Sequence, residues 1–440
     1  MDDLKINASP TKAFFISMLV RDIPLIRAIL DLIDNAVDGA KVSCGCDDLK
    51  GCQIDIKLNK DRFLITDNCG GIDPKIAKDY AFRFGRPDSA AVNPGSIGRF
   101  GVGMKRTLFK LGRYFSIQST TRTSTFSIEQ DVDDWLNKKE WEFEFSALET
   151  DQHFKEDQVS TSIEVTKLHE SIAAEFDLET FRTALISEIE TAYPISLNSG
   201  LIITLNNIPV NIKPLEILTS DKISPAYFEK DYVTPSGNTV NVVIYAGLAD
   251  RSKSDSGWYV FCNGRMVLEH DQTHITGWGE GNGKIVSKFH TNFAYFRGFV
   301  FFSSDDAEAL PWTTTKTGLD TDLPLYKAVR HEMIGVMKPI LKFQSDLAKE
   351  KSEYEAGNRD DAPLNTELNK ADATWFNDKT PVATFSAPAA IKVAAKPRLG
   401  RIQYNKKLEA IATVKKVLGV STNKGIGEKT FDYFYENECE

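Results

Sequence analysis

The sequence lacks the features of a secreted, membrane or metal-rich protein. Its 440 residues include only six cysteines and six histidines, which indicates reduced thiols more than a disulfide scaffold. No H-E-x-x-H or H-x-H pair supports a histidine-based metal enzyme. The longest apolar run, FFISMLV, is far too short to span a bilayer, and the segment MDDLKINASP is acidic and polar. We therefore expect neither secretion nor membrane insertion, but a cytoplasmic protein.

An excess of basic charge is also missing. The formal net charge is −9, so the chain as a whole lacks the basic footprint of a nucleic-acid-binding protein, although a local basic groove is compatible with this value. The fractions of 42% hydrophobic and 26% charged residues suit a protein with a sizeable core. The length predicts two or three domains.

Three of the cysteines lie close together in one loop, at Cys44, Cys46 and Cys52. Three thiolates could supply most of a zinc site. The spacing matches no standard zinc knuckle, however, and no fourth ligand is evident nearby. We therefore do not expect a zinc site here.

Periodicity predicts an α+β fold. Residues 12–42 are expected to be helical with a break near Pro24, and residues 53–67 to form a β-hairpin. Further strands of one antiparallel sheet are predicted at 114–121, 123–130, 141–147 and 161–168. Helices are expected to cover one face of this sheet. A helix over 174–192 closes the first domain, which we place at residues 1–198.

A second α+β domain is expected over residues 199–349. Its predicted elements are a hairpin at 201–212, strands at 241–248, 257–269 and 295–303, and a helix at 325–349. Residues 350–398 are polar and then rich in Ala and Pro, which is typical of a flexible linker. Residues 399–440 form a small tail with one amphipathic helix.

The stretch AILDLIDNAVDGA, residues 28–40, combines a buried stripe with unusual acidity. The apolar residues with helical spacing are Leu30, Ile33 and Val37, and the polar residues crowded into the same turns are Asp31, Asp34, Asn35 and Asp38. Carboxylates this close repel one another on a helix. Positive charge must therefore lie among them.

Two further stretches suggest a ligand site. In ITDNCGGID, Asp67 leaves a strand and enters a glycine turn, where backbone can approach a ligand closely; a self-capped hairpin exit is the ordinary alternative. In residues 94–112, glycines precede a helix that begins near Met104 and carries Lys105, and amides at a helix start bind phosphate. The glycine spacing is neither that of a P-loop nor that of a Rossmann turn. Alone, it more often marks a flexible loop.

The order of these motifs resembles the GHKL, or Bergerat-fold, ATPases: gyrase, MutL, MORC proteins, heat-shock chaperones of the ninety-kilodalton class and histidine kinases. The four boxes are the acidic helix, Asp67, the glycine segment with Lys105, and TSIEV at 161–165. The resemblance covers residues 11–195 strongly and continues more weakly to about residue 340. It implies a Bergerat ATP-binding domain followed by a transducer-like α+β domain.

The resemblance assigns roles on the acidic helix. Asn35 matches the family's magnesium ligand, and Mg²⁺ with ATP phosphates would offset the local acidity. Asp31 stands where hydrolysing members carry a glutamate that polarises water, so it is expected to be the general base, a purely structural charge being the alternative. Asp34 is expected to face solvent or a neighbouring basic group. Asp38 is counted with the ATP-binding residues and is expected to organise the helix end.

The remaining ATP-binding residues follow from the same resemblance. Asp67 matches the aspartate that reads the adenine amino group, and Thr161 the threonine that shares a water with it. Two departures, Cys69 and Ser160 in place of glycines, are small enough to preserve the pocket. Gly71 and Ile72 are expected to line the base. The phosphate-covering lid is expected to comprise Gly98, Gly101, Val102, Gly103 and Lys105. The ATP-binding residues also include Arg99, Phe100 and Met104.

The second domain is similar to the transducer of MutL, gyrase and MORC proteins. Asn263, Gly264 and Arg265 look like the family's N-x-R strand turn. Lys316, in LPWTTTKTGLD, stands where those proteins send a lysine to the γ-phosphate, and we count it as catalytic. Such a contact would couple ATP hydrolysis to domain movement.

These expectations describe an ATPase switch that uses ATP and Mg²⁺ and forms an ATP-dependent homodimer. The architecture is most similar to bacterial stand-alone GHKL proteins related to MORC, some of which belong to DNA-associated or anti-phage defence systems. An ATP-gated scaffold or chaperone-like protein with little turnover, and a histidine-kinase-like phosphotransferase, remain alternatives. The tail could bind a protein partner, whereas the net charge does not support a nucleic-acid partner.

Overall fold

The structure is a computed structural model that describes residues 11–21, 23–45, 48–84, 95–98, 103–378, 382–391 and 402–439. It divides into two units, which are described separately. The first comprises Met1–Lys351 with Ala362–Ile391, and the second comprises Ser352–Asp361 with Lys392–Glu440. Within the described residues, no helix is both long and apolar enough to cross a membrane.

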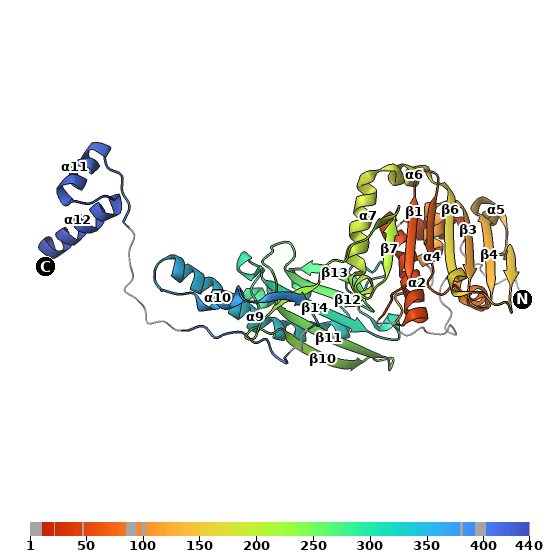
Figure 1. Cartoon of the computed structure of the whole chain (residues 1–440). Helices are drawn as coiled ribbons and strands as arrows, with labels where there is room; N and C mark the ends of the chain where they lie inside the picture. Colours follow the sequence, from red (N-terminus) through yellow and green to blue (C-terminus); the bar gives the residue numbers. More distant parts are fainter. Residues whose placement is uncertain are drawn as a thin grey trace, which may run out of the picture. The chain divides into compact units, whose positions relative to one another are not determined.

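The first unit begins with a mixed, mostly antiparallel sheet in the order β5-β4-β3-β6-β2-β1-β7-β8 (Figure 1). Its strands are β1 (Gln53–Leu58), β2 (Phe63–Asp67), β3 (Gly112–Thr120), β4 (Thr125–Asp131), β5 (Ala147–Glu149), β6 (Ser160–Leu168), β7 (Ile202–Leu205) and β8 (Ile208–Pro209). β1 and β7 run parallel, whereas the other neighbouring pairs are antiparallel. The order places the end of β2 beside the start of β6.

Helices cover this sheet. They are α1 (Lys12–Arg21), α2 (Leu25–Cys44), α3 (Pro74–Ile76) with a π-helix at Ala77–Ala81, α4 (Gly103–Leu111), α5 (Val132–Asn137), α6 (Glu170–Asp177), α7 (Glu179–Ala192) and α8 (Pro194–Asn198). Alternate residues of β1, β4 and β6 are buried, as expected for a sheet with one face against helices. α2 packs against both α4 and α7, so the acidic helix lies in the middle of the helix layer.

A second sheet follows in the order β10-β11-β14-β12-β13. Its strands are β10 (Ala226–Val233), β11 (Thr239–Leu248), β12 (Gly257–Cys262), β13 (Arg265–Asp271) and β14 (Phe296–Ser303). The long helix α9 (Pro324–Glu355) packs with this sheet through the main hydrophobic cluster, and a second cluster that includes Tyr259, Phe299 and Phe376 adds a further core. Short 3-10 helices connect the elements at His274–Thr276, Glu280–Gly283, Thr291–Phe293 and Ala307–Ala309.

Two strand pairings cross the domain limits expected from the sequence. The hairpin β7–β8, expected in the second domain, joins the first sheet through parallel pairing of β7 with β1. Much of the expected flexible linker is ordered: α9 continues to Glu355, α10 spans Pro363–Leu368, and β15 (Asp372–Trp375) pairs with β9 (Glu216–Thr219). Both pairings join residues far apart in the sequence.

Two expected elements differ locally. The predicted helix 174–192 is two helices, α6 and α7, with Leu178 between them in an extended conformation. Of the predicted strand 141–147, only Ala147 is in a strand, as the first residue of β5. Its aromatic residues instead pack on other rings, Trp141 and Phe143 against Trp135 and Phe145 against Phe126.

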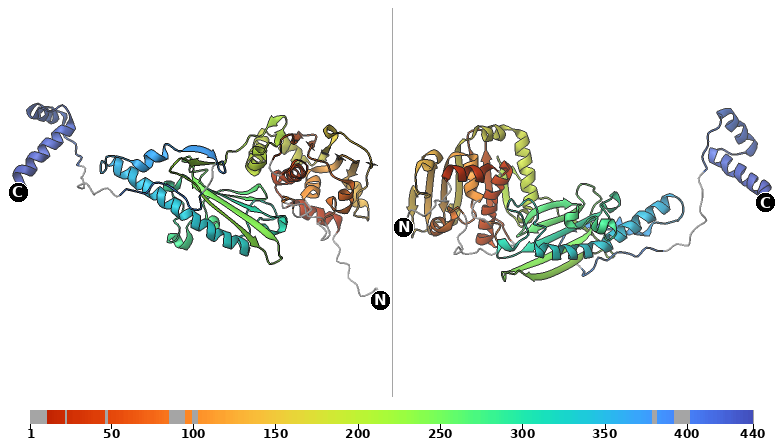
Figure 2. Two further views of the ribbon diagram at one scale, coloured as in Figure 1. Left: turned by 60° about the horizontal axis from the view of Figure 1, so that its bottom comes forward. Right: turned by 180° about the vertical axis from the view of Figure 1, so that it is seen from behind.

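The described part of the second unit includes a pair of helices (Figure 2). α11 (Leu408–Leu418) ends at Gly419, which adopts the left-handed conformation. Thr422 then caps α12 (Asn423–Glu438) by accepting a hydrogen bond from Gly425 N. The tail therefore holds a second helix, which includes the FDYFYENE segment.

Candidate functional site

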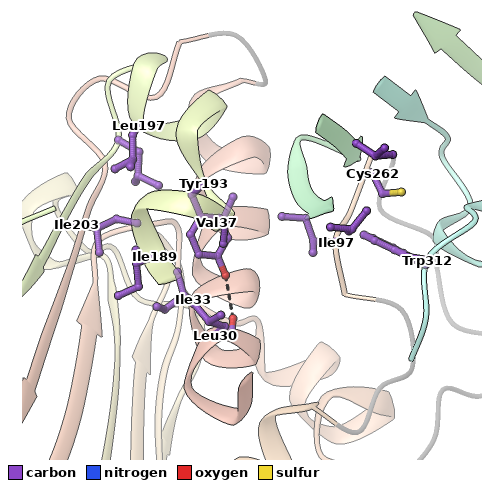
Figure 3. Packing of buried hydrophobic residues seen from close by; sticks show 14 of the residues in the cluster. Leu30, Ile33, Val37, Ile97, Ile189, Tyr193, Leu197, Ile203, Cys262 and Trp312 are labelled. Atoms are coloured by element: carbon purple, nitrogen blue, oxygen red, sulfur yellow. Dashed lines mark hydrogen bonds between the residues drawn. The ribbon is translucent and has the colours of Figure 1, made fainter. Parts of the chain in front are cut away.

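The apolar stripe of α2 is buried, as its spacing predicts. Leu30, Ile33 and Val37 are fully buried in the main hydrophobic cluster, and Figure 3 shows them beside α7 and α8 residues. The hydroxyl oxygen of Tyr193, the residue that follows α7, lies 3.0 Å from Leu30 O. α2 is thus fixed by packing and by a buried polar contact before its acidic residues are considered.

Asp34 is fully buried and is surrounded by basic groups. Its Oδ1 accepts hydrogen bonds from the Tyr193 hydroxyl at 2.7 Å and from Arg265 Nη1. Its Oδ2 accepts from Lys316 Nζ at 2.6 Å. Burial alone would raise the pKa of Asp34, but Arg265 and Lys316 outweigh that effect and hold the pKa below its usual range. Asp34 is therefore ionised and lies between two cations of the second domain.

Asp31 is also buried and paired. Its Oδ2 accepts from Arg106 Nε at 2.9 Å and from Arg106 Nη2 at 2.5 Å, and its Oδ1 lies 3.5 Å from Lys316 Nζ. A Cβ on Gly103 would come within 3.1 Å of Asp31 Cγ, so the glycine lets α4 approach α2 closely enough for Arg106 to reach the carboxylate.

These contacts change the expected source of positive charge. Mg²⁺ and ATP phosphates were expected to offset the acidity of α2, but in the structure Arg106, Arg265 and Lys316 already do so for the two buried carboxylates. Of the two environments expected for Asp34, solvent or a neighbouring basic group, the structure shows the second. Lys316 lies 282 residues after Asp34 in the sequence. The spacing of residues on α2 therefore cannot predict this contact.

Asp38 binds the backbone that leads into the glycine segment. Its carboxylate accepts hydrogen bonds from Ile97 N at 2.7 Å and from Gly98 N at 2.8 Å. Burial raises the pKa of Asp38, although Lys41 and these amides oppose the shift. Asp38 therefore holds the 95–98 segment instead of only organising the end of α2.

The second domain contacts the same segment from the other side. Asn263 Nδ2 donates to Ser96 O at 2.7 Å and to Ser304 O at 3.1 Å. Lys41 Nζ donates to Asn263 O at 2.7 Å. Figure 3 shows Ile97 pointing toward Cys262 and Trp312 of the second domain. Residues 95–98 thus lie between α2 and the β12–β13 turn and are hydrogen-bonded to both.

The expected lid and the other ATP-binding residues of this segment lie only partly within the described residues. Arg99, Phe100, Gly101 and Val102 fall outside them. Lys105 is buried, which lowers its pKa to about 7, and its Nζ donates to Ala81 O at 2.8 Å. The lysine is therefore bound to the backbone of the π-helix in this structure, and its contact with phosphate stays a prediction.

A cavity of about 160 Å³ lies between α2 and the sheet. Residues expected to bind ATP line it together: Asn35, Asp67, Gly71, Ile72, Met104 and Thr161. Gly71 has a φ of +71°, and a Cβ there would lie 2.2 Å from Thr120 O, so only glycine fits this turn. The cavity joins residues from four separated parts of the sequence into one concave site.

Asp67 is the acidic group of this cavity. Burial raises its pKa to about 6, although Cys69 N donates to Oδ1 at 2.9 Å and opposes the shift. Strand pairing places Asp67 opposite Thr161 on β6. Such an acceptor suits an amino group of a purine base.

Ser119 is a site residue that the sequence did not single out. Its Oγ accepts a hydrogen bond from Ile72 N at 2.7 Å and shares one with Thr161 Oγ1 at 3.1 Å. It therefore fixes the glycine turn and orients the threonine beside Asp67. The sequence signal that could have identified Ser119 is a small polar residue at a buried strand position. In the register of the sheet it lies opposite Thr161.

The cysteine loop differs from expectation. Cys44, at the end of α2, forms a disulfide with Cys52, just before β1. The expectation of reduced thiols therefore does not hold for this pair. Cys46 lies outside the described residues. Among the residues that are described, no group of three or more His, Cys, Asp or Glu side chains is placed to hold a metal.

Asn35 is suited to hold Mg²⁺ together with a bound phosphate. Its side chain is exposed on the cavity wall, and a Cβ built on Gly98 would lie 3.7 Å from its Oδ1. No described residue makes a hydrogen bond to this amide. Its oxygen is a hard donor of the type that Mg²⁺ prefers.

Comparison with known families agrees with this geometry. The family described as histidine kinase-, DNA gyrase B-, and HSP90-like ATPase matches residues 23–162. None of the curated proteins matches the chain. The matched range begins before α2 and ends at Ser162 on β6, so it contains the cavity residues Asn35, Asp67 and Thr161. Residues 23–162 are therefore a GHKL ATPase domain with the Bergerat fold, a domain type that binds ATP.

Proposed function

We propose that the protein is a Mg²⁺-dependent ATPase in which the second domain senses the nucleotide through Lys316. One observation carries this proposal: Lys316 Nζ lies 2.6 Å from Asp34 and 3.5 Å from Asp31, although it belongs to a loop of the other domain. A cation delivered beside the expected general base can respond to the charge of a γ-phosphate. ATP and ADP would then favour different positions of the second domain.

Each residue has a distinct part in the proposed reaction. Asp67, which lies beside Thr161 and Ser119, accepts a hydrogen bond from the adenine amino group. Asn35 would hold Mg²⁺, which neutralises phosphate charge when bound. Asp31 accepts a proton from the water whose oxygen attacks the γ-phosphorus, and the bond from that phosphorus to the ADP oxygen breaks.

The paired state of Asp31 makes hydrolysis dependent on Lys316. Arg106 and Lys316 both contact the carboxylate of Asp31, so a water must take the place of one of these cations before it can reach the carboxylate. If Lys316 shifts toward the phosphates, Asp31 Oδ1 becomes available to a water. This dependence joins catalysis to the position of the second domain, and slow turnover is its natural consequence.

ATP-dependent pairing of two chains through their ATP domains is part of the proposal. GHKL ATPases commonly dimerise, which supports this step. The association with DNA or anti-phage defence rests on the resemblance alone, as does a protein partner for the tail. An ATP-gated scaffold and a histidine-kinase-like phosphotransferase are the competing functions.

Asn35→Ala tests the proposal. We expect steady-state phosphate release from wild type with Mg-ATP, and little release with EDTA. The variant should lose the Mg²⁺-dependent part of its ATP affinity in calorimetry while its unfolding transition is unchanged, since Asn35 is exposed on the cavity wall. Phosphate retained on a protein histidine would favour the phosphotransferase, and ATP binding without release would favour the scaffold. Unchanged Mg-ATP affinity would remove Asn35 from the site.

A further inference from the structure

Asp34 has no part in the reaction proposed above, yet it is buried more deeply than Asp31, the expected general base. We propose that Asp34 is a positioning residue that competes with the γ-phosphate of ATP for Lys316, and so sets how strongly the protein prefers ATP over ADP. This proposal rests on the proposed function of Lys316. Asp34 does not contact substrate in it; it acts through the lysine.

The two oxygens of Asp34 have separate partners. Oδ1 accepts from Tyr193 and Arg265, whereas Oδ2 accepts from Lys316. Arg265 can therefore stay in place while Lys316 leaves, because the two cations do not share an oxygen. The carboxylate thus combines a fixed contact to β13 with a separable contact to the 311–320 loop.

The contact between Lys316 and Asp34 is costly to break. Asp34 is fully buried and Lys316 is 6% exposed, so water screens their attraction poorly. Moving the ammonium to a phosphate sacrifices this charged hydrogen bond. The γ-phosphate offers a replacement, but ADP has no such group. The strength of the pair therefore lowers ATP affinity and leaves ADP affinity largely unchanged.

Asp31 is less suited to this role. Its Oδ2 is already held by Arg106, and its Oδ1 lies 3.5 Å from Lys316 Nζ, compared with 2.6 Å for Asp34 Oδ2. Lys316 also has a φ of +55°, in the left-handed region that lysine rarely adopts. Its amide donates to Thr313 O at 2.9 Å. The loop therefore presents the lysine from a constrained turn, with Asp34 as its nearest acidic partner.

The decisive experiment is a double-variant cycle on the full chain. Asp34→Asn keeps the shape of the side chain and removes its charge. ATP and ADP affinities are measured by calorimetry with Mg²⁺ in wild type and in a Lys316→Met background. We expect Asp34→Asn to raise ATP affinity about tenfold, a usual size for coupling between sites, and to change ADP affinity little. In the Lys316→Met background the same substitution should have no effect on ATP affinity.

Control variants distinguish competition for Lys316 from a general effect of lost charge or lost stability. Asp61→Asn removes an exposed charge in the β1–β2 turn and should alter neither affinity. If Asp34→Asn alone does not fold, because Arg265 is left buried and unpaired, the cycle is run with Asp34→Asn/Arg265→Met. An equal change for ATP and ADP, a fall in ATP affinity, or the same effect without Lys316 would overturn the inference. If Lys316→Met itself leaves ATP affinity and turnover unchanged, the proposed function fails instead.

Discussion

Arg106 donates two hydrogen bonds to a single oxygen of Asp31, from Nε at 2.9 Å and from Nη2 at 2.5 Å to Oδ2. The other carboxylate oxygen is approached only by Lys316 among the described residues. In the proposed mechanism the two cations have different roles: Arg106, within the ATP domain, holds the carboxylate, and Lys316, from the second domain, controls access to its remaining oxygen. Asp31 thus lies between one cation of the ATP domain and one cation of the second domain.

Asp31→Asn should abolish hydrolysis while ATP still binds. We expect phosphate release to fall by about 10²–10⁴-fold, the usual contribution of a positioned base, and ATP affinity to change only severalfold. Asp31→Glu is the matched control, because it restores the longer side chain of the family and should retain turnover. Equal rates for wild type and Asp31→Asn would show that Asp31 is only a structural charge.

Asp67 should give ATP binding a pH dependence centred near its raised pKa of about 6. Below that pH the folded protein holds Asp67 neutral and the carboxyl group is a weaker acceptor. Above it, the carboxylate accepts a stronger, charge-assisted hydrogen bond from the adenine amino group, so ATP affinity should rise roughly fivefold as pH increases from 5 to 7.

The control for this pH dependence is Asp67→Asn. Phosphate protonation affects ATP binding to both proteins alike, so the difference between the two pH profiles reports on Asp67. The variant should show a flatter profile and should lose ATP affinity more than GTP affinity. Parallel profiles, or an equal loss of both nucleotides, would count against its role in reading adenine.

Asn263→Gly should remove the side-chain hydrogen bond that holds the 95–98 segment to the second domain. Asn263 has a φ of +48°, so glycine keeps the backbone conformation, but Ser96 O and Ser304 N lose their side-chain partner. We expect the free energy of unfolding to fall by about 1–3 kcal/mol, the cost of unsatisfied buried groups, as measured by urea denaturation. Asn207→Gly, at an exposed turn residue with a φ of +66°, is the control. Similar losses for both variants would mean that Asn263 serves only its turn.

Local patterns in the sequence predict much of the ATP domain. The stripe on α2, the β1–β2 hairpin, Asp67 at the end of β2 and the start of α4 all depend on residues within a few turns of one another. The family resemblance then placed Asn35 and Thr161 in one site. The structure brings both to the wall of the same cavity.

The rest depends on contacts across long stretches of chain. The partners of Asp34 come from the junction of α7 and α8, from β13 and from the 311–320 loop, and no spacing on α2 specifies them. The pairing of β7 with β1, and of β15 with β9, crosses the expected domain limits for the same reason. Residues 141–147 have a strand-like pattern, but packing of their aromatic rings determines their conformation.

The central claim is that Lys316 couples the second domain to ATP hydrolysis, and Lys316→Met tests it most directly. Phosphate release and the affinities for ATP and ADP should be measured on one preparation, with the exposed Lys284→Met of the same domain as control. We predict that Lys316→Met binds ATP but hydrolyses it at least about 10²-fold more slowly, while Lys284→Met matches wild type. Wild-type turnover in Lys316→Met would contradict the account, because the 311–320 loop would then be a structural contact without a part in the reaction.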